Sequence, residues 1–208
     1  MKTATEDPPV SPTVIPRSDV SGADGLRILD YGSIYGARLV ATRLFRRGDL
    51  ILPLLGRLTP EATFRSIQVD VGLHLEGFPF KFMNHSCRPT AVVETRQLAV
   101  CAWSEIKAGQ EVTFFYPSTE WHMVRPFECF CGAPDCIRYV AGAGCLSLDL
   151  LGRYFINPHV RKLAAAALAR VADGEYTAKD PRGRLNKYAG PAWNLSKRAR
   201  HILKEKHQ

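Results

Sequence analysis

The stretch Asn84-His85-Ser86-Cys87, followed downstream by Glu111-Val112-Thr113-Phe114-Phe115-Tyr116, decides how this chain is interpreted. A third stretch carries Cys129, Cys131 and Cys136 in a C-x-C-x-x-x-x-C spacing. Structural zinc sites take four ligands in tetrahedral geometry, and cysteine binds the ion as thiolate. Three thiols are one short of such a site, and Cys87 is a candidate for the fourth ligand. By spacing alone, unliganded thiols remain the alternative.

Length and composition indicate one domain with appendages. The chain has 208 residues and a hydrophobic content of 46%, enough for an ordinary core. Its first 22 residues are rich in proline and lack the apolar stretch of a secretion signal, so we expect a disordered arm. With no export signal, the six cysteines do not indicate a disulfide framework, and we expect Cys101 and Cys145 to be reduced, buried thiols. The cytoplasm is the default location, with the nucleus as the alternative in a eukaryote.

The positive charge is concentrated at the C-terminal end. The formal net charge is +8, and from residue 151 onward 13 lysine and arginine residues stand against 4 acidic ones. Such a basic region fits nucleic acid or an acidic partner, and a solvated helical surface is the alternative. No uncharged apolar run reaches the 18 residues of a membrane span.

The first two thirds of the chain predict short strands. We expect strands over residues 37–43, 49–55 and 111–115, and a hairpin that pairs residues 91–93 with 98–101. One short helix is expected over residues 59–66, with Thr59 as cap and Pro60 in its first position. The pattern predicts a mainly β core.

Helices are predicted after the cysteine cluster. Asn157-Pro158 has the form of a helix cap and first position, and an apolar stripe at helical spacing runs from Val160 to Val171, with Gly174 as the stop. A final basic helix is predicted around residues 195–203.

These motifs, in this order, resemble the SET-domain lysine methyltransferases that carry a post-SET zinc module. The resemblance covers residues 36–137. It implies a pseudoknotted β-fold with short helices and a C-terminal helical extension, and a zinc site made by Cys87, Cys129, Cys131 and Cys136. The implied organisation is a disordered arm (1–22), the SET domain (23–120), the post-SET module (121–145) and a basic helical extension (146–208).

The resemblance also implies a reaction, methyl transfer from S-adenosylmethionine to a lysine amine of a protein or peptide. A lysine amine has a free pKa of about 10.4, so it must lose its proton before it can act as a nucleophile. A narrow aromatic channel favours the neutral amine by desolvation. Tyr116 matches the tyrosine that orients the amine. Phe114 matches the position where phenylalanine permits multiple methylation.

The cofactor-binding residues implied by the resemblance are Gly36, Ala37, Arg38, Lys81, Asn84, His85 and Phe130. The chain departs from the family pattern at three positions. Arg38 replaces a glycine, Phe115 replaces an aspartate, and Thr90 stands where an asparagine is common.

Two other functions fit the same residues. In the first, methyl transfer or other S-adenosylmethionine-dependent chemistry acts on a small-molecule or peptide amine, which the departures at Arg38 and Phe115 suggest. In the second, the domain is a non-enzymatic, zinc-stabilised interaction module whose basic C-terminal helices bind nucleic acid.

Overall fold

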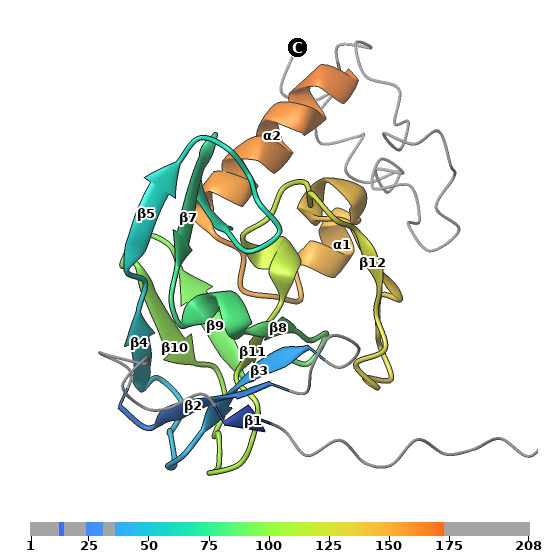
Figure 1. The fold of residues 1–208 in the computed structure, drawn as a ribbon. Helices are drawn as coiled ribbons and strands as arrows, with labels where there is room; N and C mark the ends of the chain where they lie inside the picture. Colours follow the sequence, from blue (N-terminus) through green and yellow to red (C-terminus); the bar gives the residue numbers. More distant parts are fainter. Residues whose placement is uncertain (1–12, 15–23, 31–35, 173–208) are drawn as a thin grey trace, which may run out of the picture.

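The protein is built mainly from short strands. The computed structural model describes residues 13–14, 24–30 and 36–172 (Figure 1). The strands are β1 (Thr13–Val14), β2 (Leu26–Asp30), β3 (Ala37–Ala41), β4 (Leu50–Pro53), β5 (Gly56–Thr59), β6 (Ile67–Asp70), β7 (Leu73–Gly77), β8 (Asn84–His85), β9 (Ala91–Glu94), β10 (Ala99–Ala102), β11 (Thr113–Phe114), β12 (Phe127–Glu128) and β13 (Tyr139–Val140). Three 3-10 turns, η2 (Phe80–Phe82), η3 (Tyr116–Ser118) and η4 (Ala143–Cys145), and two helices, α1 (Leu148–Leu151) and α2 (Pro158–Ala172), complete the described part.

The strands form small sheets rather than one large one. Three sheets have three strands each, in the orders β1-β2-β3, β4-β10-β9 and β5-β7-β6, and β12 pairs with β13. The predicted hairpin is confirmed, because β9 and β10 pair antiparallel with Ala99 opposite Glu94. Leu98 ends the connecting turn in the left-handed region, at φ 48°. Within the predicted N-terminal arm, β1 pairs with β2.

One parallel pair joins two segments that are far apart in the sequence. In β8 and β11, Asn84 lies opposite Thr113 and His85 lies opposite Phe114. The pairing continues past the strand ends, because the backbone N–H of Ser86 donates to the carbonyl of Phe114 at 3.1 Å. Tyr116 begins η3 directly after this pair. The two quoted stretches are therefore held side by side by backbone hydrogen bonds.

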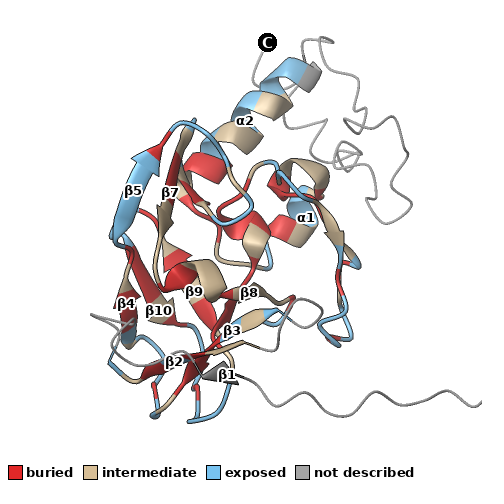
Figure 2. Cartoon of the chain, viewed as in Figure 1, coloured by how far each residue is buried: buried red, intermediate tan, exposed pale blue. Residues whose placement is uncertain are grey.

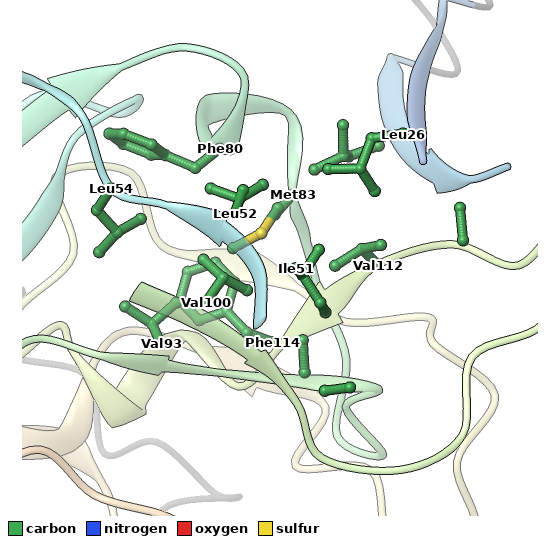
Figure 3. Close-up of a cluster of buried hydrophobic side chains, with 14 of the residues drawn as sticks. Leu26, Ile51, Leu52, Leu54, Phe80, Met83, Val93, Val100, Val112 and Phe114 are labelled. Atoms are coloured by element: carbon green, nitrogen blue, oxygen red, sulfur yellow. The ribbon is translucent and has the colours of Figure 1, made fainter. Parts of the chain in front are cut away.

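Two hydrophobic clusters make up the interior (Figure 2). The first lies among the sheets, where Val93, Val100 and Phe114 pack near Met83 and Phe80 (Figure 3). The second contains residues of the cysteine segment and of both helices. Tyr116 packs against both clusters, so it lies where they meet.

The start of α2 is joined to the β-strand core by a buried asparagine. Asn157 is fully buried, and its side-chain amide donates to the carbonyls of Val93 at 2.8 Å and Ser118 at 3.0 Å. Its Oδ1 accepts from the backbone N–H of Thr95 at 2.9 Å. The expected helix start at Pro158 is confirmed. The side chain of Asn157, however, binds the core and does not cap the helix.

Some sequence predictions need correction. Residues 59–66 form no helix: Thr59 ends β5, and the hydroxyl of Thr63 accepts from the backbone N–H groups of Arg65 and Ser66. Such local side-chain bonds compete with helical hydrogen bonding. Cys101 and Cys145 are only partly buried. The strand over 111–115 is limited to β11, and the predictions at Gly174 and residues 195–203 lie outside the described residues. Among the described helices, none is long and apolar enough to cross a membrane.

Candidate active site and metal centre

Tyr116 is held rigidly at the junction of the two clusters. Its hydroxyl donates to the carbonyl of Met83 at 2.8 Å, and its backbone N–H donates to Nδ1 of His85 at 3.2 Å. Burial raises the pKa of the Tyr116 phenol, and the nearby carboxylates of Glu111 and Glu120 raise it further. The hydroxyl is therefore protonated at neutral pH, and its direction is set by Met83.

A cavity of about 300 Å³ opens beside Tyr116. Its walls are mostly aromatic and apolar, with a few charged groups. The ring of Phe114 lies 4.7 Å from that of Tyr116, and the ring of Phe127 lies 6.0 Å from it, centroid to centroid. The residues that line the cavity include Phe80, Lys81, Met83, Phe114, Tyr116, Glu120 and Phe127, together with Arg65 and Arg125. The space suits a narrow amine with an apolar stem.

His85 connects Tyr116 to the cysteine cluster. Its Nδ1 accepts from the Tyr116 backbone, so the ring proton lies on Nε2, which is 3.3 Å from Sγ of Cys87. Burial lowers the pKa of His85 to about 4, so the ring is neutral. Both ring nitrogens are engaged within the protein, and the ring packs against Phe115 and Phe127.

The structure brings together the four cysteines that the resemblance implied. The Sγ atoms of Cys87, Cys129, Cys131 and Cys136 lie within 4.8 Å of one another, and Cys87 and Cys136 are 3.9 Å apart. Four thiolates at a Zn–S distance of 2.3 Å in a tetrahedron would be separated by about 3.8 Å. The donor set and its spacing therefore fit a zinc ion.

Backbone groups favour thiolate in this cluster. The N–H groups of Ile137 and Arg138 donate to the sulfurs of Cys87 and Cys136 at 3.5 and 3.4 Å. Burial raises the pKa of the Cys87 thiol, and raises that of Cys129 to about 12. For Cys131, burial acts in the same direction, but hydrogen bonds from the Ala133 backbone and from neighbouring thiols lower the pKa to about 7. A bound dication would favour thiolate at all four.

The predicted cofactor residues fall into separate groups. Asn84 donates from its side-chain amide to the carbonyl of Ala37 at 3.1 Å and to Glu111 at 2.7 Å, and Arg38 lies 3.8 Å from the same carboxylate. Gly36 adopts φ 67°, a conformation that favours glycine, and a Cβ there would meet no atom within 4 Å.

Lys81 and Phe130 lie apart from that network. Lys81 lines the aromatic cavity, with its ammonium 5.5 Å from the ring centroid of Phe78 and 5.2 Å from that of Phe82. Phe130 stands between two of the cysteines and is 84% exposed. An aromatic ring this exposed is available to stack on a planar ligand.

Comparison with known proteins decides the family. The family model described as "SET domain" matches residues 36–117. The chain is 40% identical over 137 residues to "Methyltransferase flvH" of Aspergillus flavus, an alignment that covers 64% of this chain and 74% of the relative. The chain belongs to the SET-domain methyltransferase family. The predicted family and the mainly β fold are thus confirmed, and S-adenosylmethionine-dependent methyl transfer is the chemistry assigned to the protein.

More distant relatives and solved structures also match part of the chain. The chain is 26% identical over 132 residues to the "Histone-lysine N-methyltransferase, H3 lysine-36 specific" of Candida albicans, covering 51% of this chain but only 16% of that protein. Among solved structures, KRYPTONITE in complex with mCHG DNA and SAH matches with a TM-score of 0.44 and 18% identity, covering 52% of this chain and 27% of that one. The methyltransferase domain of human SETMAR matches with a TM-score of 0.42 and 17% identity, covering 53% and 55%.

The structure accounts for two departures from the SET pattern. The hydroxyl of Thr90 donates to the carbonyl of Glu111 at 3.0 Å and accepts from the backbone N–H of Thr113 at 2.9 Å. Phe115, which replaces an aspartate, is buried and stacks on Tyr154 with 3.7 Å between ring centroids. A carboxylate there would lie in an apolar contact, so the phenylalanine matches its new neighbour.

Sequence reasoning missed two acidic residues of this SET domain. Glu111 joins Arg38 to Asn84, and Glu120 lines the cavity beside Tyr116. Glu120 had a detectable signal, because it is an acidic residue four positions after the candidate catalytic tyrosine. The role of Glu111 had no detectable signal in the sequence, because it depends on its contact with Asn84, 27 positions away in the chain.

Proposed function

We propose that this SET-domain protein transfers a methyl group from S-adenosylmethionine to a lysine amine of a protein or peptide. The observation that carries the proposal is Tyr116, whose hydroxyl is fixed on the Met83 carbonyl in a cavity of about 300 Å³ with aromatic walls. A lysine side chain has the narrow apolar stem that such a cavity accommodates. The H3 lysine-36 relatives support this substrate class.

The residues of the cavity would prepare the amine for attack. S-adenosylmethionine supplies the methyl group as a sulfonium, which an uncharged amine can attack. Phe114, Phe127 and Met83 exclude water from the amine and thereby favour its neutral form. The Tyr116 oxygen, already directed by its bond to Met83, can accept a hydrogen bond from the amine and fix the direction of its lone pair.

The remaining site residues have proposed roles in holding the cofactor and the metal. Zinc at the four cysteines would tie the segment after residue 121 to Cys87, and through His85 to the backbone of Tyr116. The proposed domain limits remain 23–120 for the SET domain and 121–145 for the post-SET module. The residues proposed to contact S-adenosylmethionine are Gly36, Ala37, Arg38, Lys81, Asn84, His85 and Phe130.

A peptide array with labelled S-adenosylmethionine tests the proposal. Wild type should label lysine-containing peptides, and Tyr116→Phe should lower the rate by about 100-fold, because the amine loses its orienting oxygen. Tyr154→Phe is the matched control. It also removes one tyrosine hydrogen bond to a backbone carbonyl, that of Cys87 at 3.0 Å, but it lies outside the cavity. Both variants should lose about 1 kcal/mol of stability, and only the first should lose activity. Equal rates for wild type and Tyr116→Phe would contradict the role of Tyr116.

The charge around the cavity favours a second candidate substrate, a small amine that carries an anionic group. Lys81, Arg65 and Arg125 all line the cavity, and a strongly basic peptide would be repelled there. Testing a panel of free diamines and amino acids beside the peptides separates the candidates. Transfer to a small amine and to no peptide would replace the first candidate by the second.

Nucleic-acid binding remains a separate proposal. It depends on the basic C-terminal region, of which α2 is described, whereas the predicted final helix over residues 195–203 lies outside the described residues. The histone-directed names of the distant relatives support the nucleus over the cytoplasm as the location.

A further inference from the structure

A buried carboxylate faces the cavity without a complete set of partners. Glu120 is only 8% exposed, and its Oε1 accepts from the backbone N–H of Gln68 at 2.7 Å and from the hydroxyl of Thr119 at 3.2 Å. Among the described residues, no hydrogen bond reaches Oε2, and this oxygen is not fully enclosed, because the enclosed side-chain atom without a partner there is Nδ1 of His74. The backbone N–H of Glu120 donates to the Tyr116 carbonyl at 3.0 Å, so the carboxylate and the phenol belong to one rigid turn.

The basic residues of the cavity do not neutralise this carboxylate. The guanidinium groups of Arg65 and Arg125 lie over the ring of Phe64, at 5.0 and 4.6 Å from its centroid, and that ring is 59% exposed. Lys81 lies over other rings, as described above. Within the described ranges, no ion pair involves Glu120. A buried carboxylate without a counter-charge is costly, so a cation arriving from outside would be stabilised there.

We propose that Glu120 binds the ammonium form of the substrate amine in the cavity and accepts its proton. The proposal rests on the proposed methyl transfer and assigns the group that makes the amine nucleophilic. The proton of R–NH3+ passes to the carboxylate, which gives R–NH2 and a neutral carboxylic acid. The amine lone pair then forms the C–N bond as the C–S bond of S-adenosylmethionine breaks, so the sulfonium becomes a thioether and the product amine carries the positive charge. Glu120 afterwards releases its proton to water.

The environment of Glu120 suits this exchange. Burial raises its pKa to about 7, against the lowering effect of the bonds from Gln68 and Thr119. A base whose pKa is near the working pH is present in its ionised form and is still strong enough to take a proton. The rings of Phe114 and Tyr116 line the same cavity, and aromatic faces attract ammonium groups.

Binding of n-butylammonium to the protein without added cofactor tests the proposal. n-Butylamine mimics the lysine side chain, and n-butanol is its uncharged counterpart. We expect wild type to bind n-butylammonium at least ten-fold more tightly at pH 8 than at pH 5.5, because Glu120 ionises between these values. Glu120→Gln keeps an oxygen for Gln68 and Thr119 but has no charge, so it should bind weakly at both. Glu128→Gln, at an exposed position of β12, should behave as wild type. NMR titration of backbone amides reports both binding and folding.

The outcomes separate this proposal from the methyl-transfer proposal. Equal binding of n-butylammonium by wild type and Glu120→Gln, or equal affinity for n-butanol, would overturn the role of Glu120. Methyl transfer by Glu120→Gln at the wild-type rate across pH 6 to 9 would overturn its role as proton acceptor and leave the activity intact. Charge-dependent binding by wild type, together with no transfer to any amine, would instead overturn the methyl transfer. Glu120→Asp keeps the charge but retracts it, and should retain the pH dependence with lower affinity.

Discussion

Phe114 forms a wall of the cavity beside Tyr116, where we propose that the amine binds. Its ring is 4% exposed and lies 4.7 Å from the Tyr116 ring at an angle of 41°. A phenylalanine leaves this wall of the cavity apolar, so in the proposed reaction a methylated amine would have room to turn and present its lone pair again. A tyrosine hydroxyl at the same position would bring a hydrogen-bonding group into the cavity.

Phe114→Tyr should therefore shift the products toward monomethylation. Wild type should give di- or trimethylated product, and the variant should give mainly the monomethylated form at a comparable first-step rate. Mass spectrometry of a single acceptor peptide at increasing reaction times measures the distribution. Phe114→Leu is the control, because it keeps the wall apolar and should keep multiple methylation. An unchanged product distribution in Phe114→Tyr would show that Phe114 does not limit the product.

Elements far apart in the sequence are tied together around the cysteine segment. Phe115 follows β11, and Tyr154 lies between α1 and α2. Their stacked rings, with an interplanar angle of 4°, join the SET core to the C-terminal helices. The hydroxyl of Tyr154 also donates to the carbonyl of Cys87 at 3.0 Å, so the same side chain contacts the backbone after β8.

Phe115→Asp, which restores the residue common in the family, should destabilise this protein. It removes the stacked contact and places a carboxylate in the second hydrophobic cluster, at a cost of about 3 kcal/mol. Chemical denaturation measures the loss. Phe115→Tyr should cost less, because the ring remains. Stability equal to wild type in Phe115→Asp would mean that the segment around Tyr154 rearranges freely.

The cysteine cluster should link metal binding to activity. Removing zinc with a chelator should loosen β12 and β13 and lower the melting temperature, because the four sulfurs would lose the ion that joins their segments. Activity should fall with it, since Cys87 is 3.3 Å from His85, which bonds to the Tyr116 backbone. The zinc content, measured by mass spectrometry, is compared with the melting temperature and the methyl-transfer rate of the same samples. Cys136→Ser should reproduce the loss, whereas Cys101→Ser, outside the cluster, should not. Full activity in metal-free protein would contradict the link.

Local sequence signals predicted the elements better than the contacts between them. The hairpin of β9 and β10 and the start of α2 follow from turn and helix-start residues. The spacing of the cysteines indicated three members of the cluster, and the resemblance implied the full set with Cys87. The prediction of a helix over residues 59–66 was wrong, because a hydroxyl group there accepts hydrogen bonds from neighbouring backbone N–H groups. The parallel pairing of β8 with β11 was not predicted, because it joins residues 29 positions apart, from Asn84 to Thr113, and has no local signature. The orientation of Glu120 likewise depends on Gln68, 52 positions away.

At the scale of the whole molecule, we expect the buried carboxylate of Glu120 to lower the free energy of unfolding when it is ionised. Its carboxyl has a pKa of about 7 in the folded protein, above the ordinary value of 4.5, because burial disfavours the charged form. Between these two pH values the folded state retains a proton that the unfolded state has released. Stability from this group is therefore complete below about pH 4.5, falls as the pH rises through 7, and is level above that.

Glu120→Gln should be more stable than wild type above pH 7, by on the order of 3 kcal/mol, and should match it near pH 4.5. Buried histidines contribute in the opposite direction: burial lowers the pKa values of His74 and His159, so their effect is a loss of stability as the pH falls. Because both proteins contain these histidines, the difference between their unfolding free energies at each pH isolates Glu120. Denaturant unfolding from pH 4.5 to 8.5 provides that difference. A difference that stayed constant with pH would mean that Glu120 is neutral, or paired, throughout the range. Glu120 would then carry no free charge in the cavity, and the proposed ammonium binding would be contradicted.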